Sequence, residues 1–318
     1  MDKSDLIGSL SEGSEFVGFY ALKKCEFKEY EGGCRLDIEL SDKSGSVPGV
    51  IWDNPQETRN LLKNSSIVKV KGKLQSYKDS PQAKIEKIRP AKEDDEYDPD
   101  SFLPWTDADV EALKIKVDNY VQSLKEPHLS KLASMIFNNE SFTNDFSRAP
   151  GGMKWHHPYL GGLLEHSVGV TDICQFMAEN HPELNRDLLI LGALLHDVGK
   201  IKELSATSII DYSDEGRLEG HIIIGYNFVR NICDRIEDFP PKLKMLLSHL
   251  ILSHQGQKEF SSPVEPMTPE AFVIYYADEL DAKLNAVGRI VETTRKNGDK
   301  WSEFVRILGR YIYSDGEF

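Results

Sequence analysis

The chain has 318 residues, 40% of them apolar and 28% charged, with a formal net charge of −14, which excludes a disordered or fibrous protein and suits one or two globular domains. Its longest apolar run, Leu188–Leu195, is shorter than the ~18 residues that a membrane-spanning helix needs, and the N-terminus lacks a signal-peptide pattern. Four cysteines without a CxxC pair argue against disulfides and against a thiolate zinc site, so we expect a cytoplasmic protein with no membrane partner.

The first ninety residues predict a β-domain. Five short runs are rich in β-branched and aromatic residues and are separated by turn signals: 15–30, 34–42, 46–53, 67–77 and 83–90. A polar helical stretch, 55–63, falls between the third and fourth runs. Five strands with a helix in that place is the element order of an OB-fold, although other small β-barrels give a similar order. We therefore expect a five-stranded OB-like barrel over 1–92.

Charge is distributed unevenly at the end of this β-region. Residues 63–92 hold nine basic and two acidic side chains, whereas residues 93–100 hold six acidic and no basic ones. The local field, rather than the total charge, decides what docks at a surface. The basic stretch is therefore compatible with nucleic-acid binding and equally with ordinary solvated strand faces. The acidic segment carries proline and lacks an apolar period, so we expect a linker over 93–104.

The rest of the chain, residues 105–318, predicts an all-helical domain. Residues 107–124 place apolar side chains at roughly helical spacing. Further helices are expected near 128–138, 160–180, 186–199, 220–236, 241–254, 268–294 and 301–312. The expected fold class is thus multidomain, β plus all-α, in which an N-terminal five-stranded OB-like barrel precedes an all-helical domain.

Histidine and aspartate side chains stand out within the helical region. Eight of the nine histidines lie between residues 156 and 254, and the apolar stretch 188–195 ends in the adjacent pair His196–Asp197. Burying two such side chains is costly unless a partner satisfies them, and a metal ion would do so. A single His–Asp pair at a helix end, taken alone, is more often an ordinary solvated terminus.

The pair is not alone. Four further polar side chains are set in strongly apolar helical segments: His166, His221, His254 and Asp278. One such side chain is usually a hydrogen-bonded core residue, but several in one helical domain are better explained by convergence on one polar centre. His249 and His254 point about 140° away from each other on a helix. We expect His254 at the site, because Gly256 ends the helix there and active sites favour element ends.

His166, His196–Asp197 and Asp278 resemble the H…HD…D signature of HD-domain phosphohydrolases, and the histidines in GHIIIG and LSHQG resemble the branch that holds two metals. A wider set of segments resembles the YhaM-type 3′→5′ exoribonucleases over nearly the whole chain. That set comprises DKSGSVPGVIWD, HHPYLGGLLEHS, LLHDVGKIKEL, LEGH, HLILSHQG and YYADELDAK. The resemblance makes residues 105–318 an HD phosphohydrolase domain. One departure is Gln255, which stands where the family usually has a second histidine and puts the role of that histidine in doubt.

The resemblance implies a ligand set and a cofactor. It implies one metal held by His166, His196, Asp197 and Asp278, and a second metal, bridged by Asp197, that His221 and His254 complete. Two divalent cations side by side would produce a bridging hydroxide near neutral pH and would offset charge on a phosphate. Imidazole and carboxylate ligands suit manganese, iron, cobalt, nickel or zinc, and the resemblance favours manganese.

Other side chains are candidates for contacts with a substrate. Lys200 is placed to reach a phosphate, although a lysine at a helix C-terminus also simply complements the helix dipole. The resemblance implies that His157, and His156 beside it, contact the substrate from the rim formed by 148–155. Arg148 and Lys283 are weaker candidates that could equally be surface charges. The predicted catalytic residues are Asp197, Lys200 and His157.

In the β-domain, single-strand binding would need basic side chains along the strand and aromatic rings for stacking. For any one aromatic residue, a place in the core is the commoner role. Together with the resemblance, the expected nucleic-acid face comprises Trp52, Lys69, Lys71, Lys73 and Tyr77, with Tyr20 as a further aromatic.

The leading hypothesis is a metal-dependent 3′→5′ exoribonuclease that hydrolyses single-stranded RNA to nucleoside 5′-monophosphates. The sequence leaves open whether the enzyme also cuts single-stranded DNA. The barrel would hold the strand and the helical domain would cut it. A second hypothesis is a phosphohydrolase of small nucleotides whose β-domain serves regulation or assembly. A third is a non-catalytic nucleic-acid-binding protein with a degenerate helical domain. The sequence leaves open whether the chain forms a homo-oligomer.

Overall fold

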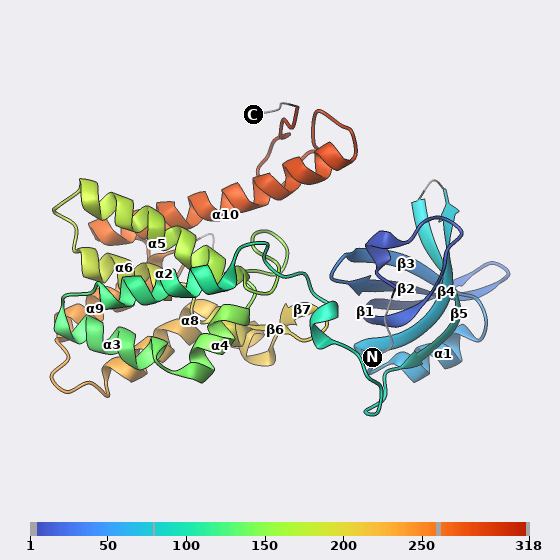
Figure 1. Ribbon diagram of the computed structural model, residues 1–318, viewed down its shortest axis with the longest axis horizontal. Coiled ribbons are helices and arrows are strands. Elements are labelled where there is room, and N and C mark those ends of the chain that lie inside the picture. Colours follow the sequence, from blue (N-terminus) through green and yellow to red (C-terminus); the bar gives the residue numbers. More distant parts are fainter. Residues whose placement is uncertain (1–4, 79, 259–261, 316–318) are drawn as a thin grey trace. The chain divides into compact units, whose positions relative to one another are not determined.

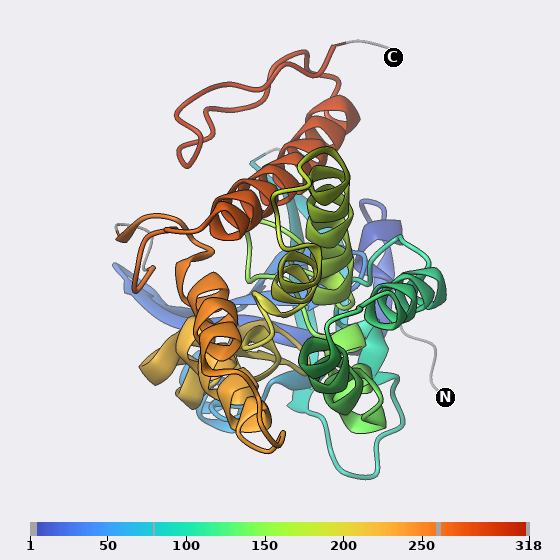
Figure 2. The ribbon, with the colours of Figure 1, turned by 90° about the vertical axis from the view of Figure 1, so that its left-hand side faces the viewer.

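The computed structural model describes residues 5–78, 80–258 and 262–315, and the chain divides into two compact units (Figure 1, Figure 2). The first unit comprises residues 1–105 and 206–211, and the second comprises residues 106–205 and 212–318. Strands dominate the first unit and helices dominate the second.

The first unit is built on a closed five-stranded barrel in the order β1-β2-β3-β5-β4. Its elements are η1 (Ile7–Ser9), β1 (Glu15–Tyr30), β2 (Gly33–Asp42), β3 (Gly45–Ile51), α1 (Pro55–Leu62), β4 (Ile67–Tyr77), β5 (Ser80–Pro90) and η2 (Pro99–Ser101). Neighbouring strands pair antiparallel except β3 and β5, which pair parallel. The barrel is an OB-fold, so the prediction from the element order is confirmed.

The barrel closes because β1 is long enough to pair with two strands. Its first half pairs with β4 and its second half with β2, and a register shift between Leu22 and Lys24 marks a bulge on the β2 side. Along β4, alternate residues point inward, so Val68, Val70 and Leu74 are buried while the lysines between them face outward.

The acidic segment 93–104 lies within the first unit. The Asp95 carboxylate forms a bidentate ion pair with the Arg89 guanidinium, at 2.6 and 2.7 Å. The Phe102 ring is buried in a small apolar cluster with Phe19. These contacts tie the segment to the barrel, and its role as a linker stays a prediction.

The second unit is helical, as predicted, with one short hairpin added. Its elements are α2 (Val110–Gln122), α3 (Pro127–Phe137), α4 (Glu140–Arg148), α5 (Gly162–Asn180), α6 (Arg186–Leu195), α7 (Lys200–Glu203), β6 (Leu204–Ala206), β7 (Ile210–Tyr212), α8 (Asp214–Cys233), α9 (Pro241–Ser253) and α10 (Pro269–Lys296). The hairpin of β6 and β7 has its tip in the first unit. Within the described ranges, no helix combines the length and apolar character needed to cross a membrane.

The helix α6 is the centre of this unit. Every residue from Asp187 to Leu195 is buried, and α3, α5, α9 and α10 all contact it. The Asn185 side chain caps its N-terminus by accepting a hydrogen bond from the Leu188 N–H at 3.1 Å. A helix that is apolar on all sides belongs in the interior. The residues that directly follow α6 therefore enter the core instead of solvent.

Two helix predictions differ from the structure. The helix predicted over 301–312 is wrong: in the described residues after α10 the chain forms isolated bridges, Trp301 to Tyr313 and Val305 to Arg310. Gly309 turns the chain between them with a φ of 64°, a left-handed conformation that a right-handed helix does not contain. The helix α4 lies where the sequence pattern predicts none, because its residues ESFTNDFSR are largely polar.

The central role of α6 predicts a large effect of truncating its side chains. Leu191→Ala removes fully buried methyl groups, so it should lower the free energy of unfolding of the helical unit by about 2–5 kcal/mol. Leu218→Ala, at a position on α8 that is 86% exposed, should change it by less than about 0.5 kcal/mol. Denaturant unfolding followed by far-UV circular dichroism measures both. Similar losses in the two variants would show that α6 is not the centre of the core.

Candidate metal centre

Six polar side chains from different helices meet in the interior of the second unit. They come from α5, the end of α6, α8, the end of α9 and α10: His166, His196, Asp197, His221, His254 and Asp278. Most of them are almost completely buried. Because α5, α9 and α10 pack against α6, and α8 packs against α7 and α9, residues far apart in the sequence reach one place.

Asp197 occupies the middle of this cluster. Its Oδ2 lies 3.5 Å from His166 Nε2 and 3.4 Å from His196 Nε2. Its Oδ1 lies 3.4 Å from His221 Nε2 and 3.3 Å from His254 Nε2. Each carboxylate oxygen thus faces its own pair of imidazoles, and Oδ1 has no hydrogen-bond partner among the described residues.

Asp278 adds a second carboxylate beside His166. Its Oδ1 lies 3.1 Å from His166 Nε2 and 4.0 Å from His196 Nε2. Among the described residues, four triads have all their donor atoms within 4.8 Å of one another. Two consist only of these six residues: His166, His196 and Asp278, and Asp197, His221 and His254. The other two include a rim histidine: His156, His166 and Asp197, and His157, His166 and Asp281. The structure therefore brings together all six residues that the sequence singled out as metal ligands.

The four histidines each engage Nδ1, which turns Nε2 toward the centre. His196 and His254 donate their Nδ1–H to carbonyl oxygens one turn earlier in the chain, at 2.7 and 2.8 Å. His166 donates its Nδ1–H to Asp281 at 2.6 Å, and His221 donates to Glu203 at 2.8 Å. A histidine that donates Nδ1–H can present an unprotonated Nε2, which is the form that binds a metal. The donor set therefore fits divalent cations.

The centre concentrates negative charge. Burial alone would raise the pKa of Asp197, but Lys200 and a neighbouring histidine hold that pKa well below its ordinary value. Burial likewise opposes protonation of His166, yet its hydrogen bonds to Asp197, Asp278 and Asp281 raise its pKa well above the ordinary value. Positive charge is thus strongly favoured near His166 Nε2, and a proton or a divalent cation can supply it.

The loop before α5 contributes a rim to the centre. Lys200 Nζ lies 2.5 Å from Asp197 Oδ2, 2.6 Å from the Gly151 carbonyl oxygen and 3.4 Å from His156 Nε2. Burial, reinforced by Lys200, lowers the pKa of His156 to about 3, and burial beside other imidazoles lowers that of His157 to about 2. Both rings carry a buried Nδ1 with no hydrogen-bond partner among the described residues.

Gly199 allows the close approach of two segments at this centre. A Cβ placed there would lie 2.0 Å from the carbonyl oxygen of His221 and 2.7 Å from the Gly225 nitrogen. Any larger residue would push α8, and with it His221, away from Asp197. The glycine that follows His196–Asp197 in the sequence is therefore needed for packing.

His249 and Gln255 differ in their relation to the centre. His249 Nε2 accepts a hydrogen bond from the Met267 N–H at 3.0 Å, outside the cluster. The side-chain amide of Gln255 lies 3.2 Å from His221 Nε2. The residue that replaces the family's second histidine is thus in contact with a candidate ligand.

Two predicted substrate contacts lie on exposed helix positions. Arg148 is the last residue of α4 and is exposed. Lys283 is exposed on α10, where it pairs with Glu279. Contact of either residue with a substrate stays a prediction.

Sequence reasoning missed three polar side chains that hold the cluster in place. Asp281 accepts from His166, Glu203 accepts from both the ring and the backbone N–H of His221, and Asn285 accepts from the His157 N–H at 2.9 Å. The first two follow a predicted site residue by three positions, on the same helical face. That spacing is the signal that identifies them.

The predicted lysines of the barrel lie on one strand. Lys69, Lys71 and Lys73 alternate with buried residues on β4, which lies between β1 and β5. Lys71 pairs with Glu86 at 3.4 Å. OB-folds usually bind their ligands on strands 2 and 3 and on the loops between strands 1–2 and 4–5. The lysines therefore lie on a strand that pairs with neither β2 nor β3, the strands that such folds use most.

The predicted aromatic residues differ in position. The exposed Trp52 follows β3 and packs edge-on against Tyr30, next to the β1–β2 turn, with the Arg35 guanidinium over its ring. Tyr77 ends β4 at the turn into β5 and is also exposed. Tyr20 is fully buried, so it belongs to the core. Trp52 and Tyr77 thus lie near the two turns that OB-folds use for ligands.

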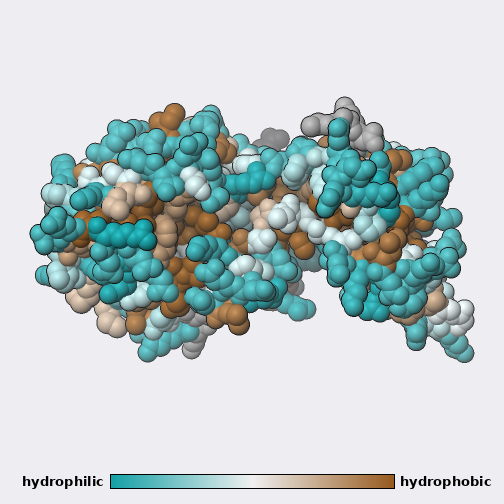
Figure 3. Space-filling model, turned by 90° about the horizontal axis from the view of Figure 1, so that it is seen from below, coloured by the Kyte–Doolittle hydropathy of each residue, from teal (hydrophilic) through white to brown (hydrophobic). Residues whose placement is uncertain are grey.

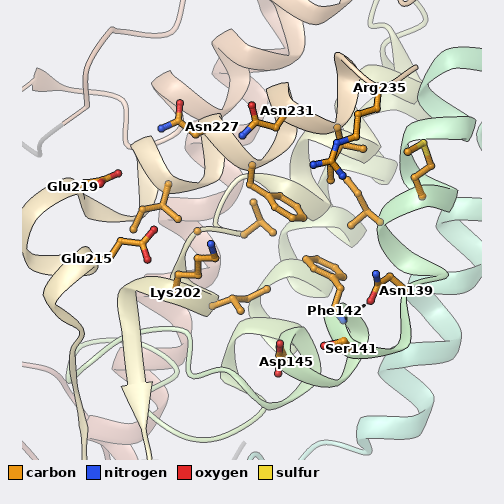
Figure 4. Close-up of a pocket in the computed structure, with 18 residues that line it drawn as sticks. Asn139, Ser141, Phe142, Asp145, Lys202, Glu215, Glu219, Asn227, Asn231 and Arg235 are labelled. Carbon is orange, nitrogen blue, oxygen red and sulfur yellow. Dashed lines mark hydrogen bonds between the residues drawn. The ribbon is translucent and has the colours of Figure 1, made fainter. Parts of the chain in front are cut away.

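A cleft of about 600 Å³ lies between α3, α4, α7 and α8. Figure 4 shows Asn227 and Asn231 on α8, and Arg235 just after that helix, across the cleft from Phe142 on α4. Figure 3 shows the helical unit from below, where hydrophobic surface is interrupted by hydrophilic residues. None of the six clustered side chains is among the described residues that line the cleft. The cleft is therefore separate from the metal centre.

Comparisons with known proteins agree with both units. Residues 24–91 match a family model described as an OB-fold nucleic acid binding domain, and residues 163–283 match the HD domain model. The chain is 33% identical to the 3′-5′ exoribonuclease YhaM of Bacillus licheniformis, over 90% of this chain and 91% of that protein. It is 32% identical to the 3′-5′ exoribonuclease YhaM of Bacillus subtilis strain 168, over 96% of each.

The chain also resembles solved structures, of which one is an HD domain. The HD domain of the phosphodiesterase PgpH from L. monocytogenes matches 42% of this chain and 79% of its own length, with 17% identity and a TM-score of 0.27. That likeness is too weak to carry an argument.

The partners of the Nδ1 atoms predict a change in metal affinity. Asp281→Asn removes the charge that orients His166, so the affinity for manganese should fall about 10- to 100-fold. Glu292→Gln, farther along the same helix in an exposed pair with Lys296, should leave the affinity unchanged. Isothermal titration of the metal-free proteins measures both. Equal affinities in Asp281→Asn and the unsubstituted protein would contradict the role given to Asp281.

Proposed function

The chain belongs to the YhaM family of 3′→5′ exoribonucleases, and from this membership we propose that it releases nucleoside 5′-monophosphates one at a time from the 3′ end of single-stranded RNA. The membership rests on two relatives that match nearly its whole length. The chain is accordingly a metal-dependent hydrolase with a nucleic-acid-binding OB-fold. We extend the proposal to single-stranded DNA as a second substrate.

The observation that carries the proposal is the position of Asp197 between two pairs of imidazoles. This arrangement supports two divalent cations bridged by Asp197. One would be held by His166, His196, Asp197 and Asp278, and the other by Asp197, His221 and His254. Imidazole and carboxylate donors suit manganese, which we propose as the metal, and would also accept iron, cobalt, nickel or zinc.

The side chains around the cluster have separable tasks in this proposal. When bound, divalent ions lower the pKa of water into the neutral range and offset the negative charge that builds up on the phosphate. Lys200 supplies a fixed positive charge beside Asp197. His156 and His157, whose rings lie next to His166, contact the substrate phosphate. Arg148 and Lys283 contact the strand farther out.

The two parts of the chain divide the work. Residues 1–92 hold the strand through Trp52, Tyr77 and the three lysines of β4, while residues 105–318 cut it and residues 93–104 connect them. The four cysteines are free thiols, which supports our proposal that the enzyme works in a reducing cytoplasm.

Labelled RNA with manganese tests the reaction and the site together. The unsubstituted protein should shorten a 5′-labelled single strand stepwise and should release the label of a 3′-labelled strand first, as a 5′-monophosphate. His254→Ala removes an imidazole that faces Asp197 and should lower kcat/KM at least about 100-fold. His249→Ala, on the same helix, should keep kcat/KM within about twofold. Hydrolysis of small nucleotides with no cleavage of the strand would favour a small-nucleotide phosphohydrolase and contradict the proposal.

The lysines of β4 predict a change in salt dependence. Replacing Lys69, Lys71 and Lys73 by glutamine should weaken RNA binding and reduce the slope of log K against log salt by about 2, because each lost phosphate contact removes about 0.7. The same change at three exposed lysines of the helical unit should leave the slope unchanged: Lys125, Lys131 and Lys242. Fluorescence anisotropy of a labelled oligonucleotide measures the slope. Equal slopes in all three proteins would make the β4 lysines ordinary surface.

A further inference from the structure

A groove of about 800 Å³ in the helical unit lies apart from the metal centre. Its walls are Lys154 and Trp155 in the loop before α5, the C-terminal half of α10, and residues 299–305. Figure 1 shows the chain after α10 folding back beside the end of that helix. The match to the HD domain ends at residue 283, so that shared fold does not account for most of the groove.

Exposed aromatic rings line this groove, and contacts with neighbouring residues fix their positions. Trp301 and Phe304 are 58% and 50% exposed. The Trp301 ring packs on Tyr313, with centroids 4.9 Å apart. The Arg295 guanidinium donates from Nε to the Ser314 carbonyl oxygen at 2.9 Å, which fixes the segment to α10. Large apolar rings kept at a surface in a fixed frame are typical of a binding site.

One face of α10 runs from the metal centre into the groove. Residues on that face are three or four positions apart: Asp278, Asp281, Asn285 and Arg289. Asn285 holds the backbone of His157, and Arg289 donates to the Trp155 carbonyl oxygen at 3.3 Å. At about 1.5 Å per residue, Asp278 and Arg289 are roughly 16 Å apart along the helix. The groove is therefore too far away to hold a reacting phosphate, but within reach of the strand attached to it.

The charges of the groove favour bases over phosphates. Lys154 and Arg289 line it together with Asp299 and Glu303, so it is not a continuous basic track. Flat aromatic rings bind nucleobases by stacking, whatever the base sequence. The lining thus suits unpaired bases with few phosphate contacts.

We propose that this groove binds nucleobases of the single-stranded substrate on the 5′ side of the bond that is cut, with Trp155, Trp301 and Phe304 as stacking surfaces. The proposal rests on the proposed exonuclease function, which brings the strand to the metal centre by its 3′ end. A dinucleotide reaches the metal centre but not the groove, whereas a longer strand reaches both. The groove therefore makes kcat/KM higher for long strands than for dinucleotides.

The test measures kcat/KM for an RNA of about a dozen nucleotides and for a dinucleotide, using the full chain with manganese. Trp301→Ala should reduce the ratio of these two values about tenfold, because losing one stacked base weakens binding by about 5- to 150-fold. Trp301→Phe keeps a flat ring and should restore most of the ratio. Phe176→Ala removes a ring that is 63% exposed on α5, outside the groove, and should keep the ratio of the unsubstituted protein.

The outcomes separate this proposal from the exonuclease function. A ratio that Trp301→Ala leaves unchanged would overturn the groove and leave the exonuclease intact. A parallel loss with both substrates would also overturn it, because a purely structural role has that signature. If the unsubstituted protein cut neither substrate, the exonuclease function would fail, and the groove with it.

Discussion

A carboxylate buried among four imidazoles is stable only when positive charge accompanies it, and the helical unit is organised around that requirement. Asp197 is 2% exposed, and an unpaired charge at such depth would be strongly unfavourable. The Lys200 ammonium group lies beside Asp197 Oδ2 and supplies part of this positive charge. The remaining carboxylates, Asp278 and Asp281, add negative charge near His166. A centre of this composition fits metal ions, which agrees with the HD domain of this chain and with the exoribonuclease family to which the chain belongs.

The fold supplies the geometry that such a centre demands. The buried body of α6 carries His196 and Asp197 into the interior, and α5, α8, α9 and α10 bring the other clustered side chains to them. Glycine at position 199 lets His221 come close to Asp197. The outer carboxylates Asp281 and Glu203 fix the rings that face inward. Stability and chemistry thus share the same residues, because the packing that buries α6 also sets the ligand positions.

The sequence predicts most of this because its signals are strong at particular places. Alternation along 67–77 and a helix between the third and fourth strands identify the barrel, and histidines in apolar helices identify the side chains that cluster in the helical unit. Asp281 and Glu203 are harder to identify, because a carboxylate on a helix is usually solvated. Their only signal in the sequence is that each follows a predicted site residue by three positions, Asp278 and Lys200 respectively. The segment 301–312 has apolar residues at helical spacing, yet Gly309 and cross-strand bridges fold it differently. The spacing of apolar residues indicates which side chains share a buried face. It does not reveal the tertiary contacts that decide whether such a segment forms a helix or a bridged loop.

The bridging position of Asp197 is tested most directly by crystals of the full chain grown with manganese, using the anomalous scattering of that metal. Two anomalous peaks are expected, one at each Asp197 carboxylate oxygen, with the first also bound to His166, His196 and Asp278 and the second to His221 and His254. Peaks located elsewhere in the helical unit, or a single peak bound to only one Asp197 oxygen, would contradict this arrangement.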